Sequence, residues 1–415
     1  MNLFGITHQR PAGMLALCLA ASGTCFVQGD PEITFTKNTL TTDYITEGAS
    51  IGDIDADGLP DVIAGTSWWK GPELTEAHTY APYKVFPITG PGLTGYSSNF
   101  FTFPEFIDED EWQDIVSVGL QFKDSYWVKN PGESPFSADN TTETAPTFTA
   151  QTHVCNESPQ LLDVIGDEGR ELLSFSDGKI ALSIPHTDES KPWKKLYITP
   201  KLPRFKKGHG LGAGDINADG LADILENTGW WEQPADWDGK EPWTFHEQVF
   251  ADSAAQMFAY DVDGDGDADV VTALKAHGYG LAWYEQTGNP EAITFTQHII
   301  MPENPKEKSP CGVSFSQLHA LDCADIDGDG IRDIITGKCY FAHNGRDPGA
   351  KDPAVIYWFQ TKRLEGGGVE FIPHLIDGDS GVGRQISTGD INGDGAVDIV
   401  SGNKKGVHAF IQDTP

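Results

Sequence analysis

A short acidic loop recurs along this chain and constrains its fold more than any other feature. The copy DIDGDGIRD, Asp325–Asp333, has aspartates at loop positions 1, 3, 5 and 9 and a glycine at position 6. Carboxylates at alternate positions of a tight loop can converge on one Ca²⁺, which prefers oxygen ligands. Gly330 permits the sharp turn that such a loop needs. The pattern therefore predicts a calcium-binding loop.

Four more complete copies and two degenerate copies follow the same pattern. The complete copies are DIDADGLPD (Asp53–Asp61), DINADGLAD (Asp215–Asp223), DVDGDGDAD (Asp261–Asp269) and DINGDGAVD (Asp390–Asp398). The degenerate copies keep Asp108, Asp110 and Asp114, and Asp163, Asp167 and Glu171. The predicted calcium ligands are Asp53, Asp55, Asp57, Asp61, Asp215, Asn217, Asp219, Asp223, Asp261, Asp263, Asp265, Asp269, Asp325, Asp327, Asp329, Asp333, Asp390, Asn392, Asp394 and Asp398.

The closing acids are separated by 46 to 65 residues, which indicates seven structural units of similar length. An EF-hand would need a glutamate at loop position 12 and flanking helices. Only Glu226 meets the first condition, and the flanks are short, apolar and β-prone. We therefore expect strand–loop–strand hairpins and an all-β, seven-bladed β-propeller with calcium-binding loops in the blade hairpins. About five Ca²⁺ are expected as structural ions.

These D-x-D-x-D-G hairpins resemble the VCBS/FG-GAP repeat family, which is similar to the propeller of the integrin alpha chain. The resemblance covers roughly residues 33–412 and implies the propeller fold and calcium. The segment ITFTKNTL, Ile33–Leu40, is similar to the outer strand ITFTQHII, Ile293–Ile300, but precedes the first inner strand. We expect it to complete the last blade and close the ring, because closure removes exposed sheet edges.

Residues 1–29 are predicted to be a signal peptide, and residues 30–415 a single propeller domain. Met14–Ala21 is a short apolar run, followed by small residues suited to cleavage. We therefore expect an exported protein, located in the periplasm, on the cell surface or outside the cell. No segment is apolar for long enough to suggest a membrane span. A net charge of −34 argues against nucleic acid and anionic membranes as partners.

A second set of residues occupies one position in every repeat, six residues before the loop begins. The inner strands should carry these residues to the channel mouth opposite the loops. The set is Glu47, Phe100, Glu157, His209, Ala255, His319 and Arg384. Loops at the same face would add Lys207, His277, Tyr340, His343, Arg346 and Lys405.

The charged members of this set suggest two kinds of chemistry. His209 and His319 with Glu47 or Glu157 have donors that suit zinc or another transition metal. Alternatively, a histidine could act as a general base while Arg384 stabilises an oxyanion. A purely structural role remains open, because channel mouths are polar in any case. The tryptophan pairs Trp68-Trp69 and Trp230-Trp231 could stack on a sugar or pack between blades, and packing is favoured.

Two functions follow from this reading. The first is a binding module, expected to act as a monomer, that takes carbohydrate or an extracellular protein at the mouth. The second is a metal-assisted lyase or dehydratase acting on a sugar or anhydrosugar, a carbon–oxygen lyase in class. GHGLGAGDINADG around His209 and LHALDCADIDGDG around His319 resemble the propeller part of aldos-2-ulose dehydratase. That resemblance implies metal or acid–base roles for His209 and His319, and their convergence in space would favour the enzyme.

The cysteines leave two alternatives open. Cys311 and Cys339 could form a disulfide in an exported protein, since export permits such bonds. Alternatively, the cysteines could be buried free thiols, and the sequence does not favour either possibility.

Overall fold

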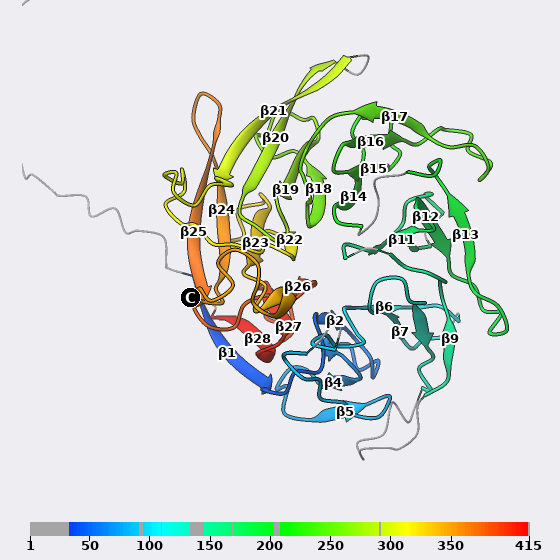
Figure 1. The fold of residues 1–415 in the computed structure, drawn as a ribbon. Helices are drawn as coiled ribbons and strands as arrows, with labels where there is room; N and C mark the ends of the chain where they lie inside the picture. Colours follow the sequence, from blue (N-terminus) through cyan, green and yellow to red (C-terminus); the bar gives the residue numbers. More distant parts are fainter. Residues whose placement is uncertain are drawn as a thin grey trace, which may run out of the picture. The chain divides into compact units, whose positions relative to one another are not determined.

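The computed structural model describes residues 33–90, 94–108, 110–132, 145–155, 157–167, 169–202, 208–289 and 292–413. The predicted signal peptide and Lys207 lie outside these residues. The described part from Ile33 onward is one compact unit, almost entirely of β-strands. Its sheets are arranged around a centre with their innermost strands facing inward, as in a β-propeller (Figure 1). The prediction of an all-β propeller architecture is confirmed.

Each unit runs outward from an innermost strand. The innermost strands are β2 (Ser50–Gly52), β6 (Phe101–Glu105), β10 (Gln160–Leu162), β14 (Leu211–Gly214), β18 (Gln256–Tyr260), β22 (Leu321–Ala324) and β26 (Ile386–Gly389). The second strands are β3 (Asp61–Ala64), β7 (Asp114–Val118), β11 (Glu171–Ser176), β15 (Asp223–Glu226), β19 (Asp269–Ala273), β23 (Asp333–Gly337) and β27 (Asp398–Asn403). Every second strand thus begins at the acid that closes a loop.

The outer half of each unit is more variable in length. The third strands are β4 (Ser67–Trp69), β8 (Tyr126–Val128), β12 (Lys179–Ile184), β16 (Gly229–Glu232), β20 (Leu281–Asn289), β24 (Ile356–Arg363) and β28 (Gly406–Asp413). The outer strands are β5 (Ala77–Thr79), β9 (Thr147–Thr149), β13 (Lys194–Tyr197), β17 (Thr244–Glu247), β21 (Ala292–Met301), β25 (Val369–Asp377) and β1 (Thr34–Thr41). β1 pairs antiparallel with β28, so the first and last strands share a sheet.

The prediction of seven separate blades is wrong in its number. Among the described residues five sheets have four strands each, and one sheet has eight, in the order β17-β16-β15-β14-β18-β19-β20-β21. The eight-stranded sheet forms because β14 and β18 pair in parallel. Gly212 permits this approach, since a Cβ there would lie 2.1 Å from the Met257 carbonyl oxygen.

The hydrophobic core lies between neighbouring sheets. One cluster, for example, packs Val62 and Trp69 of the β2–β5 sheet against Val400 and Ala409 of the β26–β1 sheet. Burial of these faces against each other holds adjacent sheets together.

Glutamines join the innermost strands across the gaps between sheets. The Gln256 side chain on β18 accepts a hydrogen bond from the Leu321 amide on β22 at 3.0 Å. The side chain of Gln385, just before β26, likewise pairs with both backbone groups of Thr102 on β6 at 2.9 Å. These amides satisfy backbone groups that a continuous sheet would pair.

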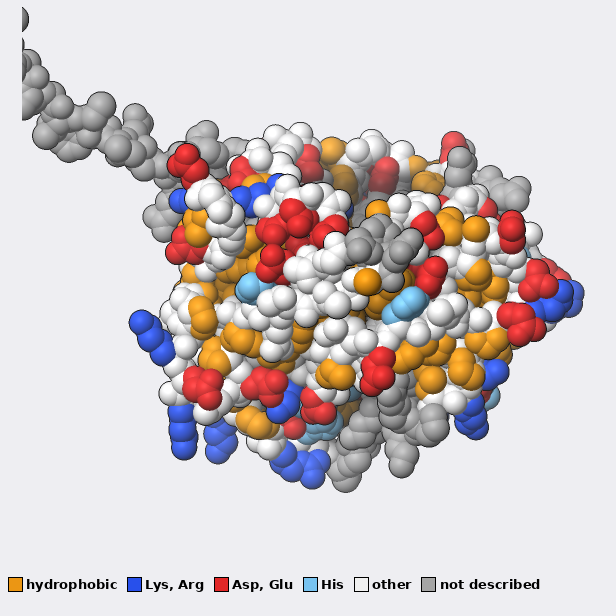
Figure 2. Space-filling model, turned by 90° about the horizontal axis from the view of Figure 1, so that it is seen from above, with side chains coloured by type: hydrophobic (Ala, Val, Ile, Leu, Met, Phe, Trp, Pro, Cys, Tyr) orange, Lys and Arg blue, Asp and Glu red, His pale blue; other side chains and the backbone are white. Residues whose placement is uncertain are grey.

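Acidic side chains dominate the surface charge. Figure 2 shows many of them on the face seen there, with hydrophobic side chains between them. This distribution agrees with the net charge of −34. Within the described ranges, no helix has the length and hydrophobicity needed to cross a membrane.

Candidate functional site

The predicted mouth residues lie just before the innermost strands, and all are buried. His319 and Glu47 have no exposed area, and Arg384 is 1% exposed. The same inner strands run from these residues to the acidic loops at their other ends. Phe100 and Ala255 belong to the set by position, but they contribute only apolar surface.

Arg384 is the centre of the buried charge. Its Nη1 lies 3.0 Å from Oε2 of Glu47, and its Nε lies 3.3 Å from Oε2 of Glu157. Nη1 also lies 3.0 Å from the sulfur of Cys339. Two carboxylates from different sheets therefore share one guanidinium, which compensates their burial.

Aromatic rings cover the other side of this charge. The Arg384 guanidinium lies 5.2 Å from the ring centre of Tyr96 and 5.4 Å from that of Phe100. The buried ammonium of Lys404 lies 4.3 Å from the ring centre of Tyr96 and donates to the Phe341 carbonyl. Both cations thus have favourable ring contacts in a place with little water.

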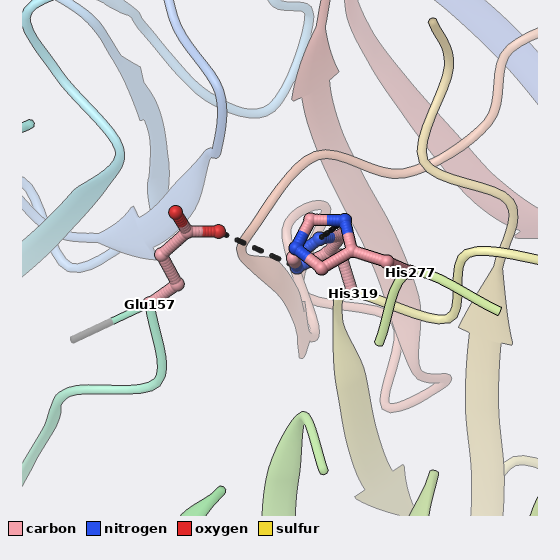
Figure 3. A group of neighbouring side chains, drawn as sticks. All are labelled: Glu157, His277 and His319. Carbon is pink, nitrogen blue, oxygen red and sulfur yellow. Dashed lines mark hydrogen bonds and ion pairs between the residues drawn. The ribbon is translucent and has the colours of Figure 1, made fainter. Parts of the chain in front are cut away.

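Three histidines form a chain beside the arginine. His319 Nδ1 lies 3.7 Å from Glu157 Oε2, and His319 Nε2 lies 3.2 Å from His277 Nδ1 (Figure 3). His277 Nε2 in turn lies 3.2 Å from His209 Nε2. The ring centres of His209 and His319 are 5.2 Å apart. The two histidines singled out by sequence therefore converge, with His277 between them.

Asp347 and His343 extend the chain outward. Asp347 Oδ2 lies 3.2 Å from His277 Nδ1 and 3.0 Å from His343 Nδ1. The exposed fraction of the side chain rises from 0% in His319 to 25% in His277 and 41% in His343. A ligand from solution would therefore meet His343 and His277 first.

The electrostatics set the charge of each group. Burial, reinforced by His277 and Arg384, lowers the pKa of His319 well below its usual value, so its imidazole is neutral. Burial alone would raise the pKa of Glu157, but Arg384 and the histidines lower it, so this carboxylate is ionised. Hydrogen bonds with His277 and His343 likewise outweigh burial and lower the pKa of Asp347.

These donors fit a transition metal. Glu157, His277 and His319 each offer a ligand atom, and those atoms lie within 4.8 Å of one another. Neutral imidazoles with one carboxylate are the donor set of catalytic zinc sites. His277, His343 and Asp347 form a second such group, which shares His277.

A cavity lies along the axis among the innermost strands. It has a volume of about 390 Å³ and is lined by residues of β2, β6, β10, β18, β22 and β26. Its polar lining includes Asp322, whose carboxylate accepts a hydrogen bond from Thr388 at 2.9 Å. Burial raises the pKa of Asp322 to about 6.

The acidic loops have a common internal geometry. In the Asp325–Asp333 loop, the first aspartate accepts backbone N–H groups of Gly328, Asp329 and Gly330 at 2.8–3.0 Å. In the Asp261–Asp269 loop, oxygens of Asp261, Asp263 and Asp265 lie within 4.8 Å of one another. That set of alternate carboxylates fits Ca²⁺.

The closing aspartates bind backbone N–H groups. Asp333 accepts the Ile326 N–H with one oxygen and the Thr361 N–H of the third strand with the other, at 3.0 and 2.8 Å. Asp61, Asp223, Asp269 and Asp398 repeat the arrangement. Each closing acid therefore ties its loop to the third strand or to a residue just after it. Asn217 and Asn392 instead donate their amides to Asp219 and Asp394.

The tryptophans are packing residues in this structure. Trp68 and Trp230 are buried, and each stacks on a histidine of the neighbouring outer strand, His78 at 4.2 Å and His246 at 4.0 Å between ring centres. Trp283 and Trp358 stack on histidines in the same way. The four cysteines in the described ranges are free thiols, so no Cys311–Cys339 disulfide is present.

Sequence reasoning missed Asp347, Tyr96 and Lys404 at the site. Asp347 lies in the insertion between β23 and β24, which carries the short 3₁₀ helix η1 (Ala342–Asn344). The spacing of His343 and Asp347 was the available signal. Tyr340, Arg346 and Lys405 were also predicted to lie at this face. The Nε of Arg346 donates to the His343 carbonyl at 3.0 Å. Lys405 pairs with Asp379 at 2.7 Å and lies 4.8 Å from the ring centre of Tyr340.

Comparison with known families identifies one segment. Residues 261–336 match the family model described as FG-GAP-like repeat. The match spans the acidic loops of two successive units and the strands between them. No match was found among curated protein sequences.

Several solved structures are similar over most of the chain. An Agrocybe aegerita lectin that recognises non-reducing terminal N-acetylglucosamine has 14% identity and a TM-score of 0.42, covering 92% of this chain and 86% of that one. The exotype rhamnogalacturonan lyase YesX has 14% identity and a TM-score of 0.44, covering 91% and 72%. The V. cholerae biofilm matrix protein Bap1 has 10% identity and a TM-score of 0.41, covering 92% of both chains. At this level of likeness no function transfers from any of them.

Proposed function

This chain carries an FG-GAP-like repeat in a β-propeller arrangement. We propose that it is a metal-assisted lyase or dehydratase acting on a carbohydrate at the histidine cluster. One observation carries the proposal. Glu157, His277 and His319 come from separate parts of the chain, yet their donor atoms lie within 4.8 Å of one another. Such convergence of titratable groups is a mark of functional sites.

The metal's contribution would be electrostatic. A zinc or manganese ion on these residues would polarise a carbonyl or carboxylate oxygen of the sugar and so acidify the neighbouring C–H bond. The protein's own contribution begins with Glu157, which is held ionised by Arg384. Arg384 also fixes the position of Glu157 through a 3.3 Å contact, as partners of metal ligands commonly do.

His343 would act as the general base that removes the proton from the acidified C–H bond of the sugar. Asp347 contacts its Nδ1 at 3.0 Å, which fixes the tautomer and leaves Nε2 as the proton acceptor. The ring is exposed enough to meet a substrate, unlike His319. The protonated His343, paired with Asp347, can later return the proton to the departing oxygen.

Several further properties belong to the same proposal. The resemblance of the His209 and His319 segments to aldos-2-ulose dehydratase supports a sugar substrate. Calcium in several of the complete loops would stabilise those hairpins, and the acidic surface and the predicted signal peptide would suit an exported protein. A binding module for carbohydrate or protein is the second candidate. It is favoured by the complete burial of Arg384 and Glu47, which leaves little of the cluster to touch a substrate.

The test combines metal content with turnover. We expect the purified full chain, dialysed against calcium buffer, to retain about one equivalent of zinc or manganese. With acidic polysaccharides and oxidised anhydrosugars, it should produce the ultraviolet absorbance of a new conjugated double bond. His343→Gln should lose this activity but keep the metal. Glycan binding without product, and calcium as the sole metal, would instead establish the binding module.

A further inference from the structure

One position, in the third strand or just after it, distinguishes the acidic loops from each other. In six of the seven units it is the residue just before the N–H group that binds the closing acid. In three units its side chain contacts an aspartate of the loop. It is Lys70, Lys129, Glu232, Glu285, Gln360 or Ile411. Its charge therefore differs from loop to loop, although the complete loops have nearly the same sequence.

Lys70 reaches into the first loop, Asp53–Asp61. Its ammonium contacts Asp55, and lies 2.5 Å from Oδ2 of Asp57. These carboxylates are the aspartates at loop positions 3 and 5. Together with Asp53 they form the group whose oxygens lie within 4.8 Å of one another. The ammonium therefore contacts two of the three acids that would bind a cation.

The degenerate second loop provides an independent second case. Lys129 occupies the same third-strand position and contacts Asp108, the first conserved acid of that loop. This loop lacks the glycine at position 6 and has Glu111 there instead. A lysine thus accompanies a loop that has already lost the calcium pattern.

The other complete loops have no lysine at this position. Glu232 and Glu285 are acids, each bonded to a histidine at 2.7 Å. Gln360 donates to Asp327 at 2.6 Å, and Ile411 carries no charge. In the described ranges the nearest comparable contact is Arg363, which lies 3.6 Å from one oxygen of Asp261. Among the described residues, the aspartates at positions 3 and 5 of these loops therefore have no ion pair with a lysine or an arginine.

We propose that Lys70 is a built-in cation that replaces Ca²⁺ in the first loop, so that this loop is metal-independent while the later complete loops bind calcium. An ammonium and a divalent ion cannot occupy the same group of carboxylates, because like charges at such short distance repel strongly. A free ion loses translational freedom when it binds, whereas the ammonium of Lys70 is already attached to the chain and does not. The first hairpin would then remain ordered when calcium is removed.

The test counts calcium on the full chain by elemental mass spectrometry at a fixed free calcium concentration. Asp55→Asn/Asp57→Asn should keep the parent's calcium count. The matched variant Asp327→Asn/Asp329→Asn, at the same loop positions, should bind one ion fewer. Loss of one ion in the first variant would overturn the proposal.

A second variant tests whether the first loop gains calcium binding when the charge of Lys70 is removed. Lys70→Met keeps the length of the side chain and removes its charge, so the first loop should gain one calcium. Its unfolding temperature should then depend on calcium more steeply than that of the parent. The calcium content of Lys70→Met tests the proposal even if the Asp55→Asn/Asp57→Asn variant does not fold. A Lys70→Met chain with the parent's count and the parent's calcium dependence would overturn the proposal.

Discussion

His209 and His277 face each other with 3.2 Å between their Nε2 atoms, although they are 68 residues apart in the chain. His209 precedes β14, whereas His277 lies in the loop between β19 and β20. The parallel pairing of β14 with β18 brings these two segments together. The histidine cluster therefore depends on the β14–β18 pairing that creates the eight-stranded sheet.

His277→Ala should abolish transition-metal binding, because His277 belongs to both candidate ligand groups. Elemental analysis should show about one equivalent of zinc or manganese in the parent and less than about a tenth of that in the variant. His153→Asn is the control, since His153 is exposed, lies outside the cluster and has a positive φ that asparagine tolerates. Equal metal content in the parent and His277→Ala would contradict this role.

Arg384→Met should destabilise the protein by about 3 kcal/mol, because Glu47 and Glu157 would be left buried without compensation. Adding Glu47→Gln should restore part of that loss, since it removes one of the two uncompensated charges. Urea unfolding of the four chains of this double-mutant cycle measures the coupling. Strictly additive changes would show that the ion pair is unimportant for stability.

Gly383→Ala should destabilise the protein by about 2 kcal/mol or more. A Cβ at this position would lie 1.9 Å from the Glu47 carbonyl oxygen and 2.2 Å from that of Gly402, so the segments carrying Glu47 and Arg384 would be forced apart. Gly378→Ala is the matched control, because a Cβ there meets no atom within 4 Å. Similar unfolding temperatures for the two variants would contradict this explanation.

Acid should weaken the sheet that joins the first and last strands. His408 on β28 pairs with Thr39 on β1, and burial, reinforced by Lys37, lowers its pKa to about 4. The unfolded chain takes up this proton near pH 6.5, so stability is present above that pH and is lost as pH falls toward 4. The loss should reach about 3 kcal/mol.

His408→Gln separates this effect from the titration of other groups. The glutamine is neutral throughout, so between pH 6.5 and 4 the variant should lose about 3 kcal/mol less unfolding free energy than the parent. Chemical denaturation at several pH values measures the difference. Parallel pH profiles would show that His408 is not the group responsible.

Substitutions in the calcium loops should change stability, whereas substitutions in the histidine cluster should change activity. Asp327→Ala should lower the unfolding temperature in calcium buffer and leave any activity intact at saturating calcium, because Asp327 belongs to a hairpin loop. His209→Ala should abolish activity and leave the calcium-dependent stabilisation unchanged. If His209→Ala unfolds the protein as much as Asp327→Ala does, the cluster has only a structural role.

The sequence alone determined the repeat, the strand–loop–strand hairpins and the propeller arrangement, because each follows from local spacing. It also placed His209, His319, Glu157, Glu47 and Arg384 at one position in successive repeats. A repeating unit puts equivalent residues at the same end of its inner strand, so this inference needed no coordinates.

Only the tertiary structure decided how these side chains meet. Arg384 pairs with two carboxylates because strands far apart in the chain converge at the centre, and Asp347 joins the cluster through an insertion that no repeat predicts. The number of separate sheets depended on the close backbone approach at Gly212. Likewise, Lys70 and Asp55 are 15 residues apart, and only the pairing of β3 with β4 brings the ammonium of Lys70 into contact with the carboxylate of Asp55. Contacts between strands depend on register and approach, which local spacing does not encode.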